Sequence, residues 1–390
     1  MISIDPRRQL LLELFQAGVA RVDGRRCTRD ALRAAGSGSN ARIWTAAVGK
    51  AASAMALGAH DALGAAQERI LIITKDGHVD PETRRLPGAE IYESAHPLPD
   101  ARSITAGERL LRWMQDLPQE VAPLFLISGG ASSLVEALAE GVTLDELKRL
   151  HNVGIASGVA IAELNANRTR LSRIKGGRLT AYLRGRHARA LFISDVPGDD
   201  PAVIGSGLLG PAAASRGSDH VERTIVASID HAVAAVCAAA AERGYAVRTA
   251  GERFDGEVRR LAVRFTHELD LYPDAVHVWG GESVVRLPPH PGHGGRNQHL
   301  ALAAARIIAG RTDLFLLAAG TDGTDGVSDD AGALVDGESC ARIALAEIDV
   351  EECLRRADSG TALAAAGDLV HTGPTGTNVG DLVIGLKCES

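Results

Sequence analysis

Two basic residues follow glycines at positions where a helix is expected to begin. Lys50 comes directly after Gly49, and Arg296 follows the glycine pair of "GGRNQH" (294–299). A cation is unfavourable at a helix N-terminus, and a bound anion would offset that cost. A guanidinium can also grip a phosphate or carboxylate at two points. Both stretches are therefore candidate anion sites, with a solvated lysine and an ordinary glycine loop as the alternatives.

Acidic residues follow two of the apolar stretches. Asp195 stands in "SDVPGDD" (194–200), and Asp322 and Asp325 stand in "GTDGTDG" (320–326). A carboxylate at the end of a strand can hold Mg²⁺ or orient a substrate hydroxyl. Asp–Gly sequences also form plain turns, and for "GTDGTDG" a turn remains the alternative.

A third candidate anion site is "SGGASS" (128–133). Gly129 and Gly130 would let the backbone N–H groups approach a phosphate or carboxylate, and Ser132 and Ser133 add hydroxyls. His96, in "SAHPLPD", is singled out among the histidines because it lies between small residues and prolines.

Several familiar motifs fail in their details. A P-loop would need glycine at Trp44 and Ser or Thr at Ala51. "GSGSNA" (36–41) matches a dinucleotide fingerprint but precedes a strand and opens no helix. "HPGH" (290–293) has no further zinc ligands at a recognisable spacing, and "DGTDG" is not a calcium loop. No G-x-S-x-G elbow is present, which argues against an α/β-hydrolase.

The elements that must position these residues alternate between β-rich and Ala/Leu-rich stretches, which predicts an α/β fold with a mainly parallel sheet. Glycine or small polar clusters end the strands, where ligands bind in open α/β sheets. The first series has predicted strands at 42–49, 68–74, 122–130 and 188–196, and predicted helices at 50–63, 132–140, 143–165 and within 221–244. The second has strands at 275–281, 283–288, 313–320 and 381–386, and a helix at 298–310. We place the boundary near 245, giving a Rossmann-like domain over 1–244 and a smaller α/β domain over 245–390.

Composition narrows the class of protein. The 390 residues are 45% hydrophobic, which suffices for two sizeable cores, and the net charge of −7 argues against general nucleic-acid binding. Five cysteines without a CxxC pair suggest reduced thiols and a cytoplasmic protein. The sequence has no signal-like N-terminus and no apolar run long enough to cross a membrane.

Taken together, several motifs resemble the class II glycerate 2-kinase family, whose C-terminal part is the MOFRL domain and whose members older annotation sometimes called hydroxypyruvate reductases. The motifs are "AVGKAASAMA", "SAHPLPD", "SGGASSL", "LSRIKGGRL", "SDVPGDD", "GGRNQ", "GTDGTDG" and "TGPTGTNVGDL", in that order. The resemblance implies ATP- and Mg²⁺-dependent phosphorylation of the 2-hydroxyl of D-glycerate. It also implies a Rossmann-like domain, a smaller α/β domain and an active site in the cleft between them.

The resemblance assigns catalysis to Lys50, Asp195 and Arg296. In the mechanism that we expect, Lys50 and Arg296 neutralise charge on the transferred group, and Asp195 orients the substrate hydroxyl and accepts its proton. Asp195 and Asp322 are the expected metal ligands. The residues expected to contact substrate or ATP are Gly49, His96, Gly129, Gly130, Ser132, Ser133, Lys175, Gly176, Gly177, Glu282, Asn297, Asp322 and Asp325.

The sequence departs from the family pattern at a few positions. Thr169 and Arg170 replace a Lys–His pair, His299 replaces an acidic residue, and Leu208 lies in "GSGLLGP", where the family has "ASGPT". These departures leave two other functions open: an NAD(P)-dependent hydroxypyruvate reductase, and a related sugar-acid kinase or non-catalytic ligand-binding protein. A homodimer is also left open.

Overall fold

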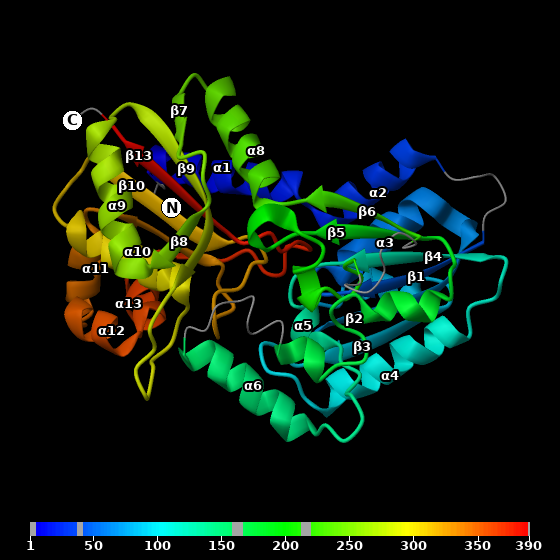
Figure 1. Ribbon diagram of the computed structural model, residues 1–390. Coiled ribbons are helices and arrows are strands. Elements are labelled where there is room, and N and C mark those ends of the chain that lie inside the picture. Colours follow the sequence, from blue (N-terminus) through cyan, green and yellow to red (C-terminus); the bar gives the residue numbers. More distant parts are fainter. Residues whose placement is uncertain (1–4, 37–41, 158–166, 212–219, 389–390) are drawn as a thin grey trace. The chain divides into compact units, whose positions relative to one another are not determined.

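The computed structural model describes residues 5–36, 42–157, 167–211 and 220–388 (Figure 1). The chain divides into two compact units. Unit 1 comprises Met1–Val22, Ile229–Thr375 and Gly380–Ser390, and unit 2 comprises Asp23–Ser228 and Gly376–Val379. Each unit is described by itself.

Unit 2 is built on a parallel sheet of six of the described strands, in the order β3-β2-β1-β4-β5-β6. The parallel sheet predicted for the first domain is thereby confirmed. All the strand carboxyl ends meet at one edge, which is where a parallel α/β sheet binds ligands. The strands are β1 (Arg42–Val48), β2 (Gln67–Lys75), β3 (Ala89–Ser94), β4 (Val121–Ile127), β5 (Ala188–Ile193) and β6 (Val221–Ala227).

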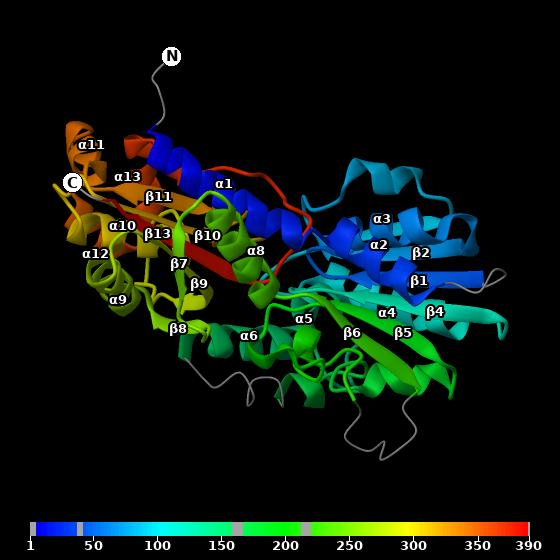
Figure 2. The same ribbon diagram turned by 90° about the horizontal axis from the view of Figure 1, so that it is seen from above.

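Helices cover both faces of this sheet. Figure 2 shows α2 (Gly24–Ala35) and α3 (Ala52–Leu63) on one face and α4 (Ala101–Gln115) on the other. Trp113 of α4 packs between Trp44 and Phe125, with ring centroids 5.8 and 5.9 Å away. Helices thus cover both faces, and the central strands β1, β4 and β5 are mostly apolar and buried, as a doubly covered parallel sheet requires.

Unit 1 contains a mixed sheet in the order β12-β11-β10-β13-β9-β7, with β8 also paired to β9. The pairs from β12 to β9 are antiparallel, whereas β7 and β8 run parallel to β9. The strands are β7 (Ala246–Thr249), β8 (Phe254–Glu257), β9 (Ala275–Val284), β10 (Leu314–Gly320), β11 (Gly332–Asp336), β12 (Leu369–Val370) and β13 (Asp381–Lys387). The helices are α1 (Pro6–Arg21), α8 (Ile229–Glu242), α9 (Val258–Leu271), α10 (Arg296–Ile307), α11 (Ser339–Leu345), α12 (Val350–Arg356) and α13 (Ser359–Ala366).

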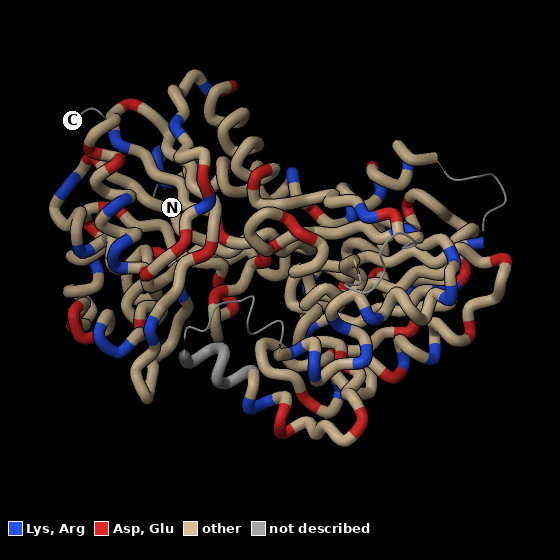
Figure 3. The backbone as a smooth tube through the Cα atoms, in the orientation of Figure 1, with Lys and Arg blue, Asp and Glu red and all other residues tan. Residues whose placement is uncertain are grey.

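The expected boundary near residue 245 lies inside unit 1, because α1 and α8 belong to that unit. Gly18 of α1 lies so close to α8 that a Cβ would be 2.8 Å from Val236 Cγ2. Arg8 of α1 also pairs with Asp336 and, at 2.8 Å, with Asp368. Figure 3 shows that Lys and Arg residues are interspersed with Asp and Glu residues along the chain. Such contacts between distant segments leave no local mark in the sequence.

Most predicted elements are present, and two differ. The helix expected at 132–140 is only α5 (Ala131–Leu134), after which Val135 is extended. In place of the two strands expected at 275–281 and 283–288, the single strand β9 runs over Ala275–Val284, and residues 285–288 are not in a strand. Helix α6 (Leu144–Ser157) begins with the predicted capping box, in which the Glu146 carboxylate accepts the Thr143 N–H at 2.8 Å. The rest of the 143–165 prediction lies in residues 158–165, outside the described ranges. Within those ranges no helix is long and apolar enough to cross a membrane.

Candidate active site

The loop that carries Lys50 is locked to the loop after β4. The Lys50 N–H donates to Gly129 O at 2.9 Å, and the Ala51 N–H donates to Ser128 Oγ at 3.0 Å. Gly49 has φ +129°, and a Cβ there would overlap Ser128. Glycine is therefore required at 49, and the contact fixes Lys50 at the carboxyl edge of the sheet.

Lys50 and His96 flank Gly130. A Cβ on Gly130 would lie 3.1 Å from Lys50 Cγ and 3.3 Å from His96 Cδ2, and its φ of +85° also favours glycine. These residues come from the loops after three strands, β1, β3 and β4. The structure thus brings together three of the residues that the sequence singled out.

Asp195 lies beside the same loop and has a partner that the sequence reasoning missed. Asn378 donates its Nδ2–H to Asp195 Oδ2 at 3.1 Å. A Cβ on Gly129 would overlap both side chains, so all three groups are in contact. Asn378 ends the "GPTGTN" stretch of the family resemblance, which was the available signal for it.

The two serines of "SGGASS" make internal hydrogen bonds. The Ser133 hydroxyl donates to Gly130 O at 3.2 Å, and the hydroxyls of Ser132 and Ser206 lie 2.8 Å apart. In this arrangement both serines brace the loop. Their expected contact with an anion stays a prediction.

The prediction that Lys175 contacts a phosphate disagrees with its position. Its side chain is fully buried, and Nζ lies 2.5 Å from Glu136 Oε2 and 2.6 Å from Ser132 O. Burial lowers the pKa of Lys175, and the Glu136 carboxylate opposes that shift. The buried amine is held by a carboxylate and a carbonyl. It therefore stabilises the loop that begins at Gly129 and is not accessible to a ligand.

The backbone N–H groups of Gly176 and Gly177 also form hydrogen bonds within the protein. Their N–H groups donate to Ser206 O at 2.9 Å and to Gly207 O at 2.7 Å. The expected phosphate contact therefore lacks these two donors, because they join two loops of unit 2. Thr169, one of the departures from the family, packs against Gly176, where a Cβ would overlap its methyl group.

Two other departures are buried. Leu208 belongs to the apolar core of unit 2. His299 lies near the start of α10, with Nδ1 2.9 Å from Ser359 Oγ, and burial lowers its pKa to about 4. A neutral imidazole therefore stands in unit 1 where the family has an acid. Arg170 is exposed.

Arg296, the first residue of α10, is held by two carboxylates within unit 1. Asp381 accepts from Nε at 2.7 Å and from a terminal nitrogen at 3.1 Å, and Glu282 pairs with the other terminal nitrogen. Burial lowers the pKa of Arg296, but the charges of Asp381 and Glu282 outweigh it and raise that pKa. The Arg296 side chain is one-third exposed, so it is oriented yet partly accessible. Asp381 is the second residue that sequence reasoning missed.

Asp325 of "GTDGTDG" caps the same helix. Its carboxylate accepts the backbone N–H of Gln298 at 2.8 Å and that of Asn297 at 3.2 Å. Burial raises the pKa of Asp325 to about 7, and the two backbone hydrogen bonds act in the opposite direction. This carboxylate faces the protein backbone at 2% exposure, and its predicted contact with substrate or ATP therefore disagrees with its position. Asn297 is buried beside it.

Asp322 occupies the turn itself. Its Oδ1 accepts the Thr324 N–H at 3.0 Å, an Asx turn, and the side chain is 5% exposed. The loop is fastened to the C-terminal segment, because Thr321 donates to Gly380 O at 2.7 Å and Thr375 donates to Thr321 O at 2.6 Å. The turn interpretation of this loop is thus realised. The metal role of Asp322 stays a prediction. In the described residues no group of three or more His, Cys, Asp or Glu side chains is arranged to hold a metal ion.

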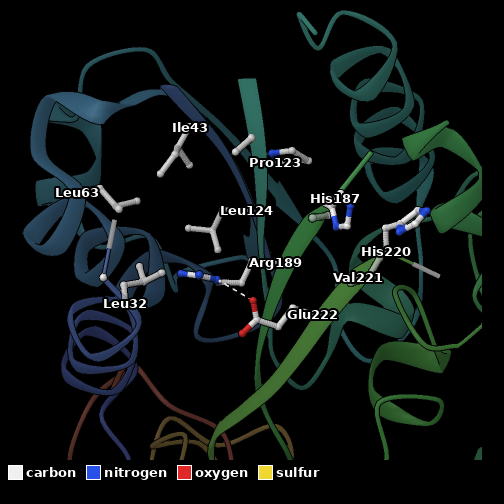
Figure 4. A pocket seen from close by; sticks show the side chains of 13 residues that line it. Leu32, Ile43, Leu63, Pro123, Leu124, His187, Arg189, His220, Val221 and Glu222 are labelled. Atoms are coloured by element: carbon white, nitrogen blue, oxygen red, sulfur yellow. Dashed lines mark hydrogen bonds and ion pairs between the residues drawn. The ribbon is translucent and has the colours of Figure 1, made fainter. Parts of the chain in front are cut away.

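A pocket of about 490 Å³ opens at the opposite, amino-terminal edge of the unit 2 sheet (Figure 4). It is lined by the first residues of β1, β4, β5 and β6 and by the ends of α2 and α3. Its polar groups are an Arg189–Glu222 ion pair at 3.4 Å and the rings of His187 and His220, 4.5 Å apart. None of the candidate site residues lines it, so this pocket is separate from the loops that hold Lys50 and Asp195.

Comparison with known proteins covers nearly the whole chain. A family model described as a domain of unknown function, DUF4147, matches residues 10–243, and the MOFRL family model matches residues 275–381. A D-glycerate 2-kinase of Thermotoga maritima is 36% identical over 382 residues, which cover 88% of this chain and 90% of that protein. A putative hydroxypyruvate reductase of Agrobacterium vitis is 36% identical over 374 residues, covering 86% and 96%. A crystal structure of glycerate kinase from Thermotoga maritima matches with a TM-score of 0.83 and 34% identity, covering 98% of this chain and 99% of that one.

Proposed function

Because the chain belongs to the DUF4147–MOFRL family that includes D-glycerate 2-kinase, we propose that it is an ATP-dependent kinase. Its proposed reaction transfers the γ-phosphoryl group of ATP to the 2-hydroxyl of D-glycerate and gives 2-phosphoglycerate. The proposed location is the cytoplasm, in keeping with five cysteines that are all free thiols.

The observation that carries the proposal is the cluster at the carboxyl edge of the unit 2 sheet. It places a lysine, a histidine and a carboxylate around the glycine pair Gly129–Gly130. Phosphoryl transfer needs little covalent help from the protein, since positioning and neutralisation of charge supply most of the catalysis. A cation beside a glycine loop, with a carboxylate close by, provides the groups for both tasks.

In the proposed mechanism the Asp195 carboxylate orients the 2-hydroxyl of the substrate and accepts its proton as the oxygen attacks the γ-phosphorus. Lys50 neutralises charge on the transferred group, and the backbone at Gly129 and Gly130 approaches an anionic oxygen. Arg296 is proposed as a second cation for the phosphates, oriented by Asp381 and Glu282. Ser132, Ser133 and His96 are proposed to line the substrate.

The residues present are compatible with Mg²⁺, which proteins commonly hold with one or two carboxylates while water and phosphate fill the other positions. Asp195 is half-buried and has a carboxylate at the strand end, as such a ligand requires. The other ligand that the sequence predicts, Asp322, belongs to unit 1, and its Oδ1 accepts a hydrogen bond within its own turn. When bound with ATP, the ion would neutralise phosphate charge.

The direct test measures ADP formation from ATP with D-glycerate and identifies the position of the phosphate on the product. Lys50→Ala, Asp195→Asn and Arg296→Ala should each lower kcat/KM on the order of 10²-fold or more. Asp200→Asn is the matched control for Asp195→Asn, since Asp200 lies in the same loop and its carboxylate only caps the Ala202 N–H. Unchanged kcat/KM in all three variants would overturn the site.

The reductase alternative has no comparable support. The fingerprint-like "GSGSNA" falls between α2 and β1, and all of it except Gly36 lies outside the described residues. A dinucleotide fingerprint follows a strand and opens a helix, which is the reverse order. Oxidation of NADH with hydroxypyruvate, without ATP turnover, would favour the reductase. Thermal stabilisation by hydroxy acids without either reaction would favour a binding protein.

A further inference from the structure

The four residues Gly376–Val379 form an unusual part of unit 2. The chain leaves unit 1 after Thr375, contributes these residues to unit 2 and returns to unit 1 at Gly380. They are closely packed there, with Thr377 and Val379 each 2% exposed and Asn378 7% exposed. The segment is small and buried, and two of its four residues, Thr377 and Asn378, are polar.

Both ends of this segment are fastened. Gly376 O accepts the Gly24 N–H at 3.2 Å, and a Cβ on Gly24 would crowd that oxygen. On either side of the segment, Thr375 and Gly380 are hydrogen-bonded to Thr321 at 2.6 and 2.7 Å. Within unit 2, the contact with Gly24 and the burial of Asn378 restrict the direction of its amide.

The Asn378 amide is aimed at Asp195. Its Nδ2–H donates to Asp195 Oδ2 at 3.1 Å, and Gly129 closes the space behind both groups. A carboxylate that accepts a hydrogen bond from a fixed, buried donor loses freedom to rotate about its Cβ–Cγ bond. A group that takes a proton must lie within hydrogen-bond reach of the reacting hydroxyl, so its orientation affects the rate.

We propose that Asn378 is the positioning residue for Asp195 and fixes the carboxylate in the orientation that receives the substrate proton. This inference rests on the proposed kinase function. Asn378 acts through Asp195, so its loss should lower kcat and leave the KM values for ATP and D-glycerate largely unchanged.

The test compares four substitutions. Asn378→Leu removes the donor in a side chain of the same branching but larger volume, and should lower kcat between about 10- and 100-fold. Thr377→Val is the matched control, because Thr377 lies in the same segment and Val keeps the shape of its side chain. The buried Thr377 hydroxyl has no protein partner among the described residues, so this variant should keep kcat within about 3-fold. In the Asp195→Asn background, Asn378→Leu should add less than about 3-fold, since residues that act as a unit are not additive. Asn378→Asp replaces the amide donor by a second carboxylate beside Asp195 and should lower kcat at least as much as Asn378→Leu.

Full kcat in Asn378→Leu, or an Asn378→Leu effect of the same size with and without Asp195, would overturn the positioning role while leaving the kinase function in place. If the wild type phosphorylates no hydroxy acid, the proposed function fails instead. The contact is then decided by urea unfolding of the Asp195→Asn, Asn378→Leu and double variants. Non-additive midpoint shifts support the pairing, and additive shifts overturn it.

Discussion

Two loops rich in Asp and Gly place their aspartates in different environments. "SDVPGDD" follows β5 in unit 2 and "GTDGTDG" follows β10 in unit 1. Asp195 of the first is half-buried at a strand end and is met by the side chain of Asn378. Asp325 of the second is fully enclosed and accepts backbone N–H groups at the start of α10.

The difference teaches that the partner decides the role of a loop aspartate. A carboxylate that accepts the backbone N–H groups at a helix N-terminus stabilises the fold, as a helix cap usually does. The Asp195 carboxylate instead accepts a side-chain amide hydrogen bond at the carboxyl edge of a parallel sheet, where ligands bind. The Asp325 cap also places Arg296, the first residue of that helix, so the second loop contributes to the proposed chemistry through structure.

The largest effect should separate the two aspartates by activity. Asp195→Asn should lower kcat/KM on the order of 10²-fold or more, because the proton acceptor is lost. Asp325→Asn keeps the shape of the cap and should change kcat/KM less than about 3-fold at neutral pH. The measurement is steady-state ADP formation with D-glycerate. Equal losses in the two variants would show that the division of roles is wrong.

The local sequence was sufficient to predict the loops at the carboxyl edge of the unit 2 sheet. Strands ending in glycine predicted the parallel sheet and the cluster of Gly49, Lys50, Gly129 and Gly130, because the chemistry of a strand end lies within a few residues of it. Asn378 could not be placed in the same way, since it lies 183 positions from Asp195 in the chain.

Long-range contacts likewise explain the errors in the candidate site. Asp381 reaches Arg296 across 85 positions, and Asp325 caps the N–H of Asn297, which lies 28 residues before it. Lys175 stands beside a glycine pair that resembles a phosphate loop, yet the fold buries its amine against Glu136. A pattern of residue types does not tell whether a charge faces a ligand or another buried charge.

The second prediction concerns the glycines that allow the turn in "GTDGTDG". Gly323 has φ +86°, and a Cβ there would overlap Gly373 O. Gly323→Ala should therefore cost about 1–3 kcal/mol more than Gly310→Ala, because overpacking adds to the cost of a positive φ. Gly310 is the matched control, with φ +79° in the same unit and open space around its Cβ position. The free energies of unfolding come from urea titrations, and equal costs for the two would contradict the close contact.

The third prediction tests the cap by removing it. Asp325→Ala leaves the N–H groups of Asn297 and Gln298 without their carboxylate, and should lower the free energy of unfolding by about 0.5–2 kcal/mol. In the other loop, Asp200 accepts the Ala202 N–H in a short turn on the surface, so Asp200→Ala should lower the free energy of unfolding by less than about 0.5 kcal/mol. Chemical unfolding followed by circular dichroism measures both. A negligible cost at Asp325 would mean that α10 is held without its cap.

The last prediction is a slope of stability with pH, and it follows from the burial of Asp325. Burial raises the pKa of this carboxyl to about 7 in the folded protein, whereas the unfolded value is near 3.9. Between those values the folded state holds the proton that the unfolded state has lost. The Asp325 contribution to stability is therefore complete below about pH 4, is lost as the pH rises to about 7, and has a slope of at most about 1.4 kcal/mol per pH unit. Asp325→Asn does not titrate, so its stability should fall less over that range. The free energy of unfolding of Asp325→Asn is subtracted from that of the wild type at each pH, which cancels the contributions of the other carboxyl groups. A flat difference between pH 4 and 7 would show that Asp325 is already ionised in the folded protein, with its two backbone donors fully offsetting the cost of burial.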